Sequence, residues 1–224
     1  MNAEPPEATT GPAKTTRTTR PYRSPRRAKS ATATREAILA AATKLFRERS
    51  YGKVTVSDIA EAASTAVPTV YASTGGKSAI LATLVDQARC DPIVDTTLVA
   101  VQGCRDPEDV VRTTAHGTRV HNERYHDMIQ VMFDAATIDD TATSTLVESN
   151  RHYRQALGHT ADRLAALRAL RSGLGPSRAI DILWFYLGHQ AWQLCVADRG
   201  WTWNEAEEWL ATQASTALLV EPRA

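Results

Sequence analysis

The stretch from Val67 to Ser78, VPTVYASTGGKS, ends in Gly-Gly-Lys-Ser, like a loop that wraps a nucleotide phosphate with backbone N–H groups. That loop needs a first glycine five positions before Gly76, and Tyr71 occupies this position. It must also follow a buried strand, whereas the preceding SDIAEAASTAVPTVY shows neither alternating hydrophobicity nor a β-branched run. The stretch therefore does not predict a nucleotide-binding enzyme.

The histidines are the other candidate reactive groups. All six lie after residue 115, and His116, His121 and His126 recur at five-residue intervals. On a helix this interval turns each side chain by about 140°, so the three do not form a metal-binding face as residues four apart would. An all-helical metal-binding protein or enzyme using the His116, His121 and Asp127 region remains the alternative interpretation. No nucleophile–base pair, zinc-spaced cluster or cofactor motif supports it, so we expect no catalysis, no metal and no cofactor.

Charge is divided unevenly along the chain. Residues 1–77 carry a balance of +7 and all five lysines, whereas residues 78–224 carry −6. This asymmetry indicates a basic module for a polyanion joined to an acidic module with another role. Within residues 14–29, KTTRTTRPYRSPRRAK, there are seven basic residues and no acidic one. This segment suits contacts with a phosphate backbone or a minor groove, and equally a solvated tail without a specific role.

Hydrophobic spacing predicts the elements that position these groups. Residues 1–32 are polar and lack periodicity, so we expect disorder there. A helix follows from Thr34 to near Gly52, and a second helix begins with Thr55 as its N-cap. After a short turn, a brief helix over Val67–Ser73 ends at Gly75-Gly76. Two short helices joined by a tight turn predict a helix-turn-helix motif, whose second helix reads the major groove.

The rest of the chain also has helical spacing, and no stretch predicts a sheet. We therefore expect an all-α fold of about nine helices: a disordered basic tail (1–32), a three-helix DNA-binding domain (33–78) and a helical ligand-binding and dimerisation domain (79–224). The most hydrophobic stretch, ILWFYLGHQAWQLCVA, is too short and too polar to span a bilayer. Without an apolar leader, and with three cysteines in helical contexts, the chain is expected to be cytoplasmic.

Residues 34–85 resemble the N-terminal domain of the TetR family, the tetracycline-repressor-like transcription factors. The resemblance lies in TREAILAAATKLF, YGKVTVSDIAEAA and VPTVYASTGGKSAILATLV, in one colinear order. It implies a homodimer built on the last two long helices, a ligand cavity in the C-terminal domain, and release from DNA when a ligand binds. By position, it also implies DNA contacts, which are expected at Thr55, Val67, Pro68, Thr69, Tyr71, Ser73 and Lys77.

Three positions depart from the family pattern. Ser64 stands where the family usually has glycine, Ala66 where it has a capping serine, and Thr74 where it has an aromatic residue. We expect Thr65 to cap the recognition helix instead. Val67 and Pro68 cannot form side-chain hydrogen bonds, so base reading there depends on thymine methyl groups or groove shape.

Large soft and aromatic side chains in two C-terminal helices predict a cavity for an apolar or aromatic ligand. The expected ligand-binding residues are His116, Met128, Met132, Phe133, Trp184, Phe185, His189 and Trp192. Any one of them could instead belong to the core or to a dimer seam. The seam is expected on two rows of small and apolar residues, which are Trp184, Leu187, Ala191 and Leu194, and Leu210, Ala214, Ala217 and Leu218.

The sequence thus predicts a dimeric repressor that binds a palindromic operator and is released by a small apolar or aromatic ligand. A TetR-like activator without a small-molecule ligand is a further alternative. The sequence identifies neither the effector nor the operator.

Overall fold

The computed structural model describes residues 25–220, and these residues form helices and no strand, as predicted for an all-α fold. The N-terminal group comprises α1 (Pro25–Glu48), η1 (Tyr51–Lys53), α2 (Val56–Ala62), α3 (Val67–Thr74) and α4 (Lys77–Arg89). The remainder comprises α5 (Pro92–Gly103), α6 (Pro107–Arg124), α7 (His126–Ala136), α8 (Asp140–Ala166), α9 (Pro176–Leu187), α10 (His189–Trp192), the π-helical turn η2 (Gln193–Asp198) and α11 (Trp203–Leu218).

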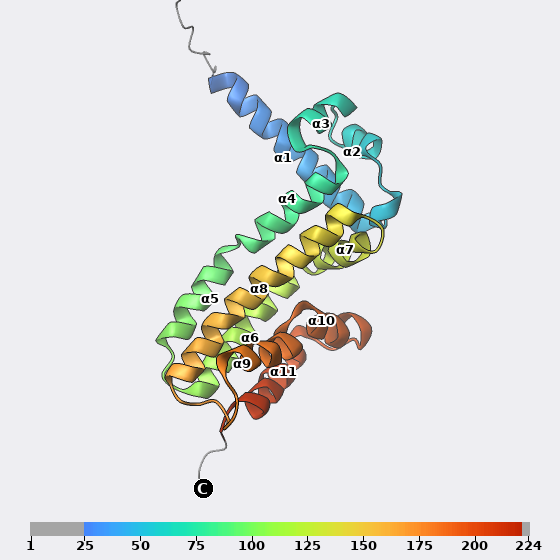
Figure 1. Cartoon of the computed structure of the whole chain (residues 1–224). Helices are drawn as coiled ribbons and strands as arrows, with labels where there is room; N and C mark the ends of the chain where they lie inside the picture. The colour runs from blue at the N-terminus through green and yellow to red at the C-terminus, as the bar shows by residue number, and fades with distance from the viewer. Residues whose placement is uncertain (1–24, 221–224) are drawn as a thin grey trace, which may run out of the picture.

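Two pairs of these helices are nearly continuous. Helices α4 and α5 run in almost the same direction (Figure 1), and only Gly188 separates α9 from α10. Counting each pair as one bent helix gives nine α-helices in residues 25–220, in agreement with the prediction.

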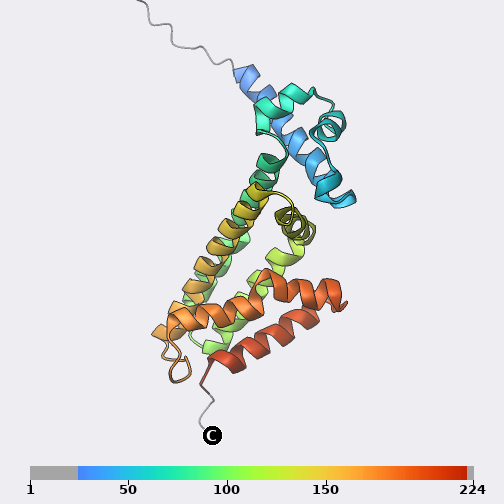
Figure 2. The same ribbon diagram turned by 45° about the vertical axis from the view of Figure 1, so that its right-hand side comes forward.

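Helices α1, α2 and α3 cluster at one end of the molecule, and α4 leads from them into the bundle (Figures 1 and 2). The cluster encloses a small core because α1 has apolar residues at three- and four-residue intervals. Ile38 and Phe46 of α1, Ile59 of α2 and Val70 of α3 are all at most 2% exposed. This core fixes the angle at which α3 is presented.

Side-chain caps set five of the helix starts, those of α2, α5, α6, α8 and α11. Thr55, the predicted N-cap, forms a capping box with Asp58 at α2, and Thr202 and Glu205 form another at α11. Asp106 caps α6, where a proline at the first helical position adds the expected constraint.

Two consecutive glycines separate α3 from α4. Gly75 (φ +81°) and Gly76 (φ +98°) both lie in the region that side chains other than glycine rarely adopt. The Gly-Gly pair therefore ends the recognition helix and turns the chain into α4.

Three expectations about boundaries and packing differ from the structure. First, α1 begins at Pro25, so residues 25–32 are helical rather than disordered, because Arg26, Arg27, Ala28 and Lys29 are good helix formers. The expected tail over residues 1–24 lies outside the described residues. Second, the amphipathic pattern from Thr141 to Leu170 predicts one helix over that whole run, but α8 ends at Ala166, because Arg168 takes a positive φ of 56°.

The third difference concerns the expected dimer seam. Leu187, Leu210, Ala214 and Leu218 are at most 2% exposed, because they pack in the protomer's own core between α6, α9 and α11. Gly188 serves that same packing, since a Cβ there would stand 2.4 Å from the carbonyl oxygen of Trp184. Four of the eight predicted seam residues therefore face inward, whereas Leu194 is exposed and the remaining three, Trp184, Ala191 and Ala217, are partly exposed.

Within residues 25–220, no helix is long and apolar enough to cross a membrane.

Candidate nucleic-acid interface and ligand cavity

Helices α2 and α3 are joined by a tight turn at Ser64. Ser64 has φ +51°, and the N–H of Thr65 donates to the Ala60 carbonyl at 2.9 Å. A serine in this conformation stores strain of about 1 kcal/mol, which glycine would avoid. Serine in place of glycine at residue 64 therefore leaves the turn intact but adds backbone strain.

The recognition helix α3 begins without a side-chain cap. Its N-cap is Ala66, which accepts no side-chain hydrogen bond, so the expectation that Thr65 caps the helix is wrong. Pro68 has no N–H, so the uncapped end has one fewer donor to satisfy.

The seven expected DNA contacts differ in how far their side chains are exposed. Thr55, Pro68 and Tyr71 are exposed, whereas Val67, Thr69 and Ser73 are partly buried. Val70, between them, is fully buried against α1 and α2. The structure thus leaves Thr55, Pro68 and Tyr71 exposed on α2 and α3, whereas Val67 packs partly against the core of this motif.

Tyr71 is the largest accessible side chain on α3, at 55% exposure. Its ring lies over Gly76, where a Cβ would stand 3.0 Å from a ring carbon. The ring is therefore supported by the backbone of the Gly-Gly turn, and its hydroxyl is left available to a phosphate oxygen.

Lys77 is placed differently from the expectation. Its ammonium donates to the Tyr51 carbonyl at 3.1 Å and lies 4.1 Å from the centre of the Tyr51 ring. It is therefore held against η1, so a contact with phosphate requires the side chain to leave Tyr51. Lys53, by contrast, is exposed and makes no ion pair within residues 25–220.

Sequence reasoning missed Arg35. From α1, its guanidinium donates to the Ser73 carbonyl at the end of α3 and lies 3.4 Å from the Thr83 hydroxyl of α4. This side chain satisfies a carbonyl that the end of α3 leaves free, and it holds three helices in place. Only the fold brings residues 35 and 73 together, so spacing gave no signal.

A cavity of about 120 Å³ lies in the bundle. Its volume is on the order of ten times what a single water needs. Its wall is mostly apolar and is formed by Val85, Ala88, Arg89, Val94, Thr97, Leu98, Thr114, Gly117, Thr118, His121, Tyr125, Met128, Ile129, Met132, Ser149, His152, Tyr153, Ala156, Leu157, Thr160 and His189.

Three of the eight expected ligand-binding residues line this cavity: Met128, Met132 and His189. The other five lie elsewhere. Phe133 and Trp184 contact the His189 ring edge-on without lining the cavity. Trp192 is buried in the core, and Phe185 is 73% exposed.

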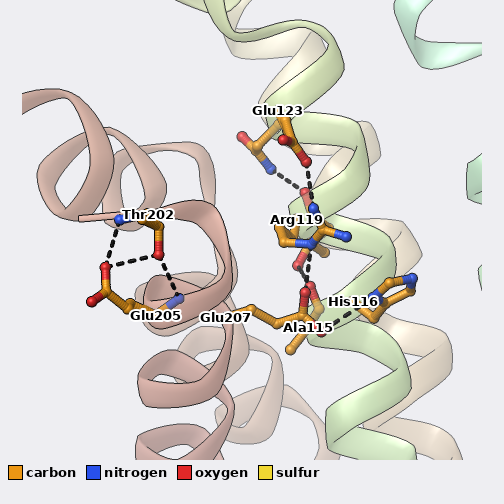
Figure 3. A network of polar contacts seen from close by, with 9 residues as sticks. Ala115, His116, Arg119, Glu123, Thr202, Glu205 and Glu207 are labelled. Atoms are coloured by element: carbon orange, nitrogen blue, oxygen red, sulfur yellow. Dashed lines mark hydrogen bonds and ion pairs between the residues drawn. The ribbon is translucent and has the colours of Figure 1, made fainter. Parts of the chain in front are cut away.

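His116 is the fifth, and it lies on a separate polar contact. Its Nδ1 is 3.1 Å from Glu207 of α11, which also pairs with Arg119 at 2.5 Å. Figure 3 shows His116 and Arg119 on α6, both directed toward Glu207. This network joins α6 to α11 outside the cavity.

Three imidazoles line the cavity: His152 lies 3.3 Å from the carboxylate of Glu148, and the tautomers of His121 and His189 follow from their partners. Asn122 donates its Nδ2 to the Thr118 carbonyl at 2.7 Å, so its Oδ1 faces His189 and accepts from Nδ1–H at 2.8 Å. His121 donates Nε2–H to the Ala88 carbonyl at 3.1 Å. Each ring therefore keeps one nitrogen lone pair: Nε2 of His189 and Nδ1 of His121.

Burial keeps the rings of His121 and His189 uncharged. Burial lowers the pKa of His189 to about 3, with the nearby His121 as a second cause. Burial also lowers the pKa of His121 below its ordinary value. At neutral pH both imidazoles are hydrogen-bond acceptors and not cations.

The alternative metal site does not assemble. His121 lies in the cavity wall, His116 binds Glu207, and Asp127 pairs with Arg47 of α1 at 2.6 Å. Among residues 25–220, no three His, Cys, Asp or Glu side chains are placed to hold a metal ion.

Comparisons with known proteins agree with this geometry. Residues 38–84 match the family model of bacterial regulatory proteins of the tetR family. No curated protein matches the chain.

Solved structures share the whole fold at low sequence identity. SmeT in complex with triclosan is 22% identical, with a TM-score of 0.69, covering 84% of this chain and 93% of its own. SmeT is described as the repressor of a Stenotrophomonas maltophilia multidrug efflux pump. NalD, a secondary repressor of a Pseudomonas aeruginosa efflux pump, is 18% identical, with a TM-score of 0.69, covering 85% and 98%. The fatty acid degradation regulator FadR from Bacillus halodurans is 16% identical, with a TM-score of 0.68, covering 81% and 94%.

Proposed function

We propose, from the premise that residues 38–84 form a DNA-binding domain of the TetR family, that this protein is a homodimeric repressor released from its operator by a small ligand. The ligand occupies the cavity lined by Met128, Met132 and His189. We place the domain boundary near residue 78, inside α4.

The proposal rests on one observation: helix α4 runs from the end of the recognition helix to the cavity wall. Its first residue, Lys77, follows the Gly-Gly turn of the recognition helix, and its last turn supplies Ala88 and Arg89 to the cavity wall. The Ala88 carbonyl accepts the hydrogen bond from His121. A ligand that displaces His121 therefore shifts α4, the helix that follows α3 in the chain. Such a ligand binds the DNA-binding conformation and the released conformation of the protein with different affinities.

The C-terminal domain also contacts the DNA-binding domain directly. Met128, Val131 and Ala135 of α7 and Ala142 of α8 belong to the same core cluster as α1–α4. A change in the cavity, where Met128 is one wall, thereby reaches the packing of α1.

Exposed apolar side chains support a dimer on the last helices. Phe185 of α9 is 73% exposed, Leu194 of η2 is 56% exposed and Trp209 of α11 is 45% exposed. In Figure 2, α9, η2 and α11 lie together along one side of the bundle. A second copy covering this side would bury these residues in a symmetric interface.

The test measures binding of the purified protein to a labelled duplex taken from upstream of its own gene, with a scrambled duplex as control. We expect preference for the upstream DNA, affinity that falls steeply with salt, and a dimer in light scattering. Triclosan, which SmeT binds, is the first ligand to add, with loss of DNA binding as the expected result. Equal affinity for both duplexes at every salt concentration would overturn the proposal.

A further inference from the structure

The cavity wall has an unusual balance of hydrogen-bonding groups, because nearly all of its hydroxyl donors are already used. Thr114 donates to the Val110 carbonyl, so the hydroxyl of Thr160, 2.9 Å away, donates to Thr114. Tyr153 donates to the Leu187 carbonyl at 2.6 Å, and Tyr125 donates to Asp91 at 2.7 Å.

The acceptors, in contrast, remain open at two places. Nδ1 of His121 is buried and has no hydrogen-bond partner. Nε2 of His189 makes no hydrogen bond within residues 25–220, although the residue is only 2% exposed. The two ring centres are 6.2 Å apart, and both rings line the cavity.

From these contacts we infer the ligand class: a neutral, largely apolar aromatic molecule that carries a hydroxyl or N–H donor, of the phenol type. Its donor binds the lone pair of His121 or His189, and its ring lies among Met128, Ile129 and Met132. This inference rests on the proposed function only in taking this cavity as the ligand site.

A negatively charged ligand fits less well. Neither His121 nor His189 is protonated at neutral pH, so neither supplies a positive charge to a carboxylate, and the third histidine of the wall, His152, already contacts Glu148 at 3.3 Å. Arg89, the one cation of the wall that is permanently charged, is already bound to Asp86 at 2.6 Å.

Two matched compounds test the inference without DNA. 1-Naphthol carries the donor, and 1-methoxynaphthalene has the same rings without it. Binding to the full chain is measured by calorimetry and by quenching of tryptophan fluorescence. We expect 1-naphthol to bind at least tenfold more tightly, because the ether leaves the buried nitrogens unpaired. Equal affinities, failure of both to bind, or tighter binding of 1-naphthoate would each overturn the inference.

Variants locate the acceptor. His121→Phe keeps a ring of similar size and removes one of the two open lone pairs, and we expect it to reduce the preference for 1-naphthol while still binding 1-methoxynaphthalene. His116→Phe is the matched control, since His116 lies on the same helix outside the cavity. Because His189 is deeply buried, His189→Gln is checked by its thermal melting curve before binding is measured.

The outcome for DNA is separate. If 1-naphthol binds with the expected preference but does not release the upstream duplex, the ligand class stands and the proposed release mechanism fails. If the upstream duplex is released by the ether equally well, the proposed function stands and the ligand class fails.

Discussion

The carboxylate of Asp139 accepts a hydrogen bond from the Ser78 hydroxyl at 2.6 Å, and the Tyr51 hydroxyl donates to the same oxygen at 3.0 Å. Asp139 also caps α8, so one side chain fastens the long helix of the bundle to η1 and α4. The hydrogen bond from Ser78 holds the pKa of Asp139 below its usual value. The Asp139 carboxylate is therefore ionised at neutral pH.

Asp139→Asn should weaken this junction while keeping a good N-cap residue. The charged acceptor is lost to both hydroxyls, so we expect the free energy of unfolding to fall by about 1–2 kcal/mol. Urea denaturation measures the change. Asp140→Asn, at an exposed position next to it, is the control and should leave stability within about 0.5 kcal/mol. If both variants lost the same free energy of unfolding, the hydrogen bonds of Asp139 would not stabilise this junction.

Ser64→Gly should stabilise the protein by up to about 1 kcal/mol, because Ser64 has φ +51° and glycine adopts this conformation without strain. Ser57→Gly, on an exposed position inside α2, should do the opposite by up to about 1 kcal/mol, since glycine weakens a helix. Thermal melting of both variants checks the pair. A loss of stability at Ser64 would show that the turn is unstrained.

Lys53 and Lys77 should differ in what they contribute. Lys53 is exposed and makes no ion pair with the described residues 25–220, so Lys53→Gln should leave unfolding unchanged and reduce the salt slope of DNA binding by about one. Lys77→Gln should also cost stability, about 1 kcal/mol, because the ammonium is held by Tyr51. Salt titrations of DNA affinity, combined with urea denaturation, separate the two roles. A Lys77 variant of unchanged stability would contradict the contact with Tyr51.

Stability should fall as the pH drops from 7 toward 5, because His189 has a lowered pKa in the folded state. Above pH 6.5 the imidazole is neutral in both states and contributes nothing to the pH dependence. Below pH 6.5 the unfolded chain binds a proton that the folded chain does not, since its pKa is about 3. The loss is about 2 kcal/mol between pH 7 and 5 for this residue, and His121 adds to it.

His189→Gln should reduce this pH dependence, since glutamine can still donate to Asn122 and does not titrate. His159→Gln, at an exposed histidine, is the matched control and should keep the full dependence. Denaturation curves at pH 5, 6 and 7 give the comparison. If both variants kept the same slope, the burial of His189 would not be the cause.

The helices were predictable because the signals that set them are local. Thr55 and Asp58 are three residues apart, and the Gly75-Gly76 pair is adjacent, so the sequence shows each cap and break directly. The cavity was only partly predictable, because it depends on which faces of α4, α6, α7 and α8 meet. His121 and His189 are far apart in sequence, and nothing near either residue shows that they line one space. Phe185 and Trp192 were predicted to line the cavity from their residue types alone. In the structure Phe185 is exposed to solvent and Trp192 is buried in the core.

The position of the Tyr71 ring over Gly76 also limits how this protein can evolve. A side chain at residue 76 would collide with the ring at 3.0 Å and would have to adopt φ +98°. A residue other than glycine at position 76 therefore meets two obstacles at once, the backbone conformation and the Tyr71 ring, whereas a change at residue 71 leaves Gly76 undisturbed. The two glycines of the Gly-Gly-Lys-Ser sequence, which resembles a nucleotide loop, are thus explained by a helix turn, and Gly76 also by the ring that lies over it.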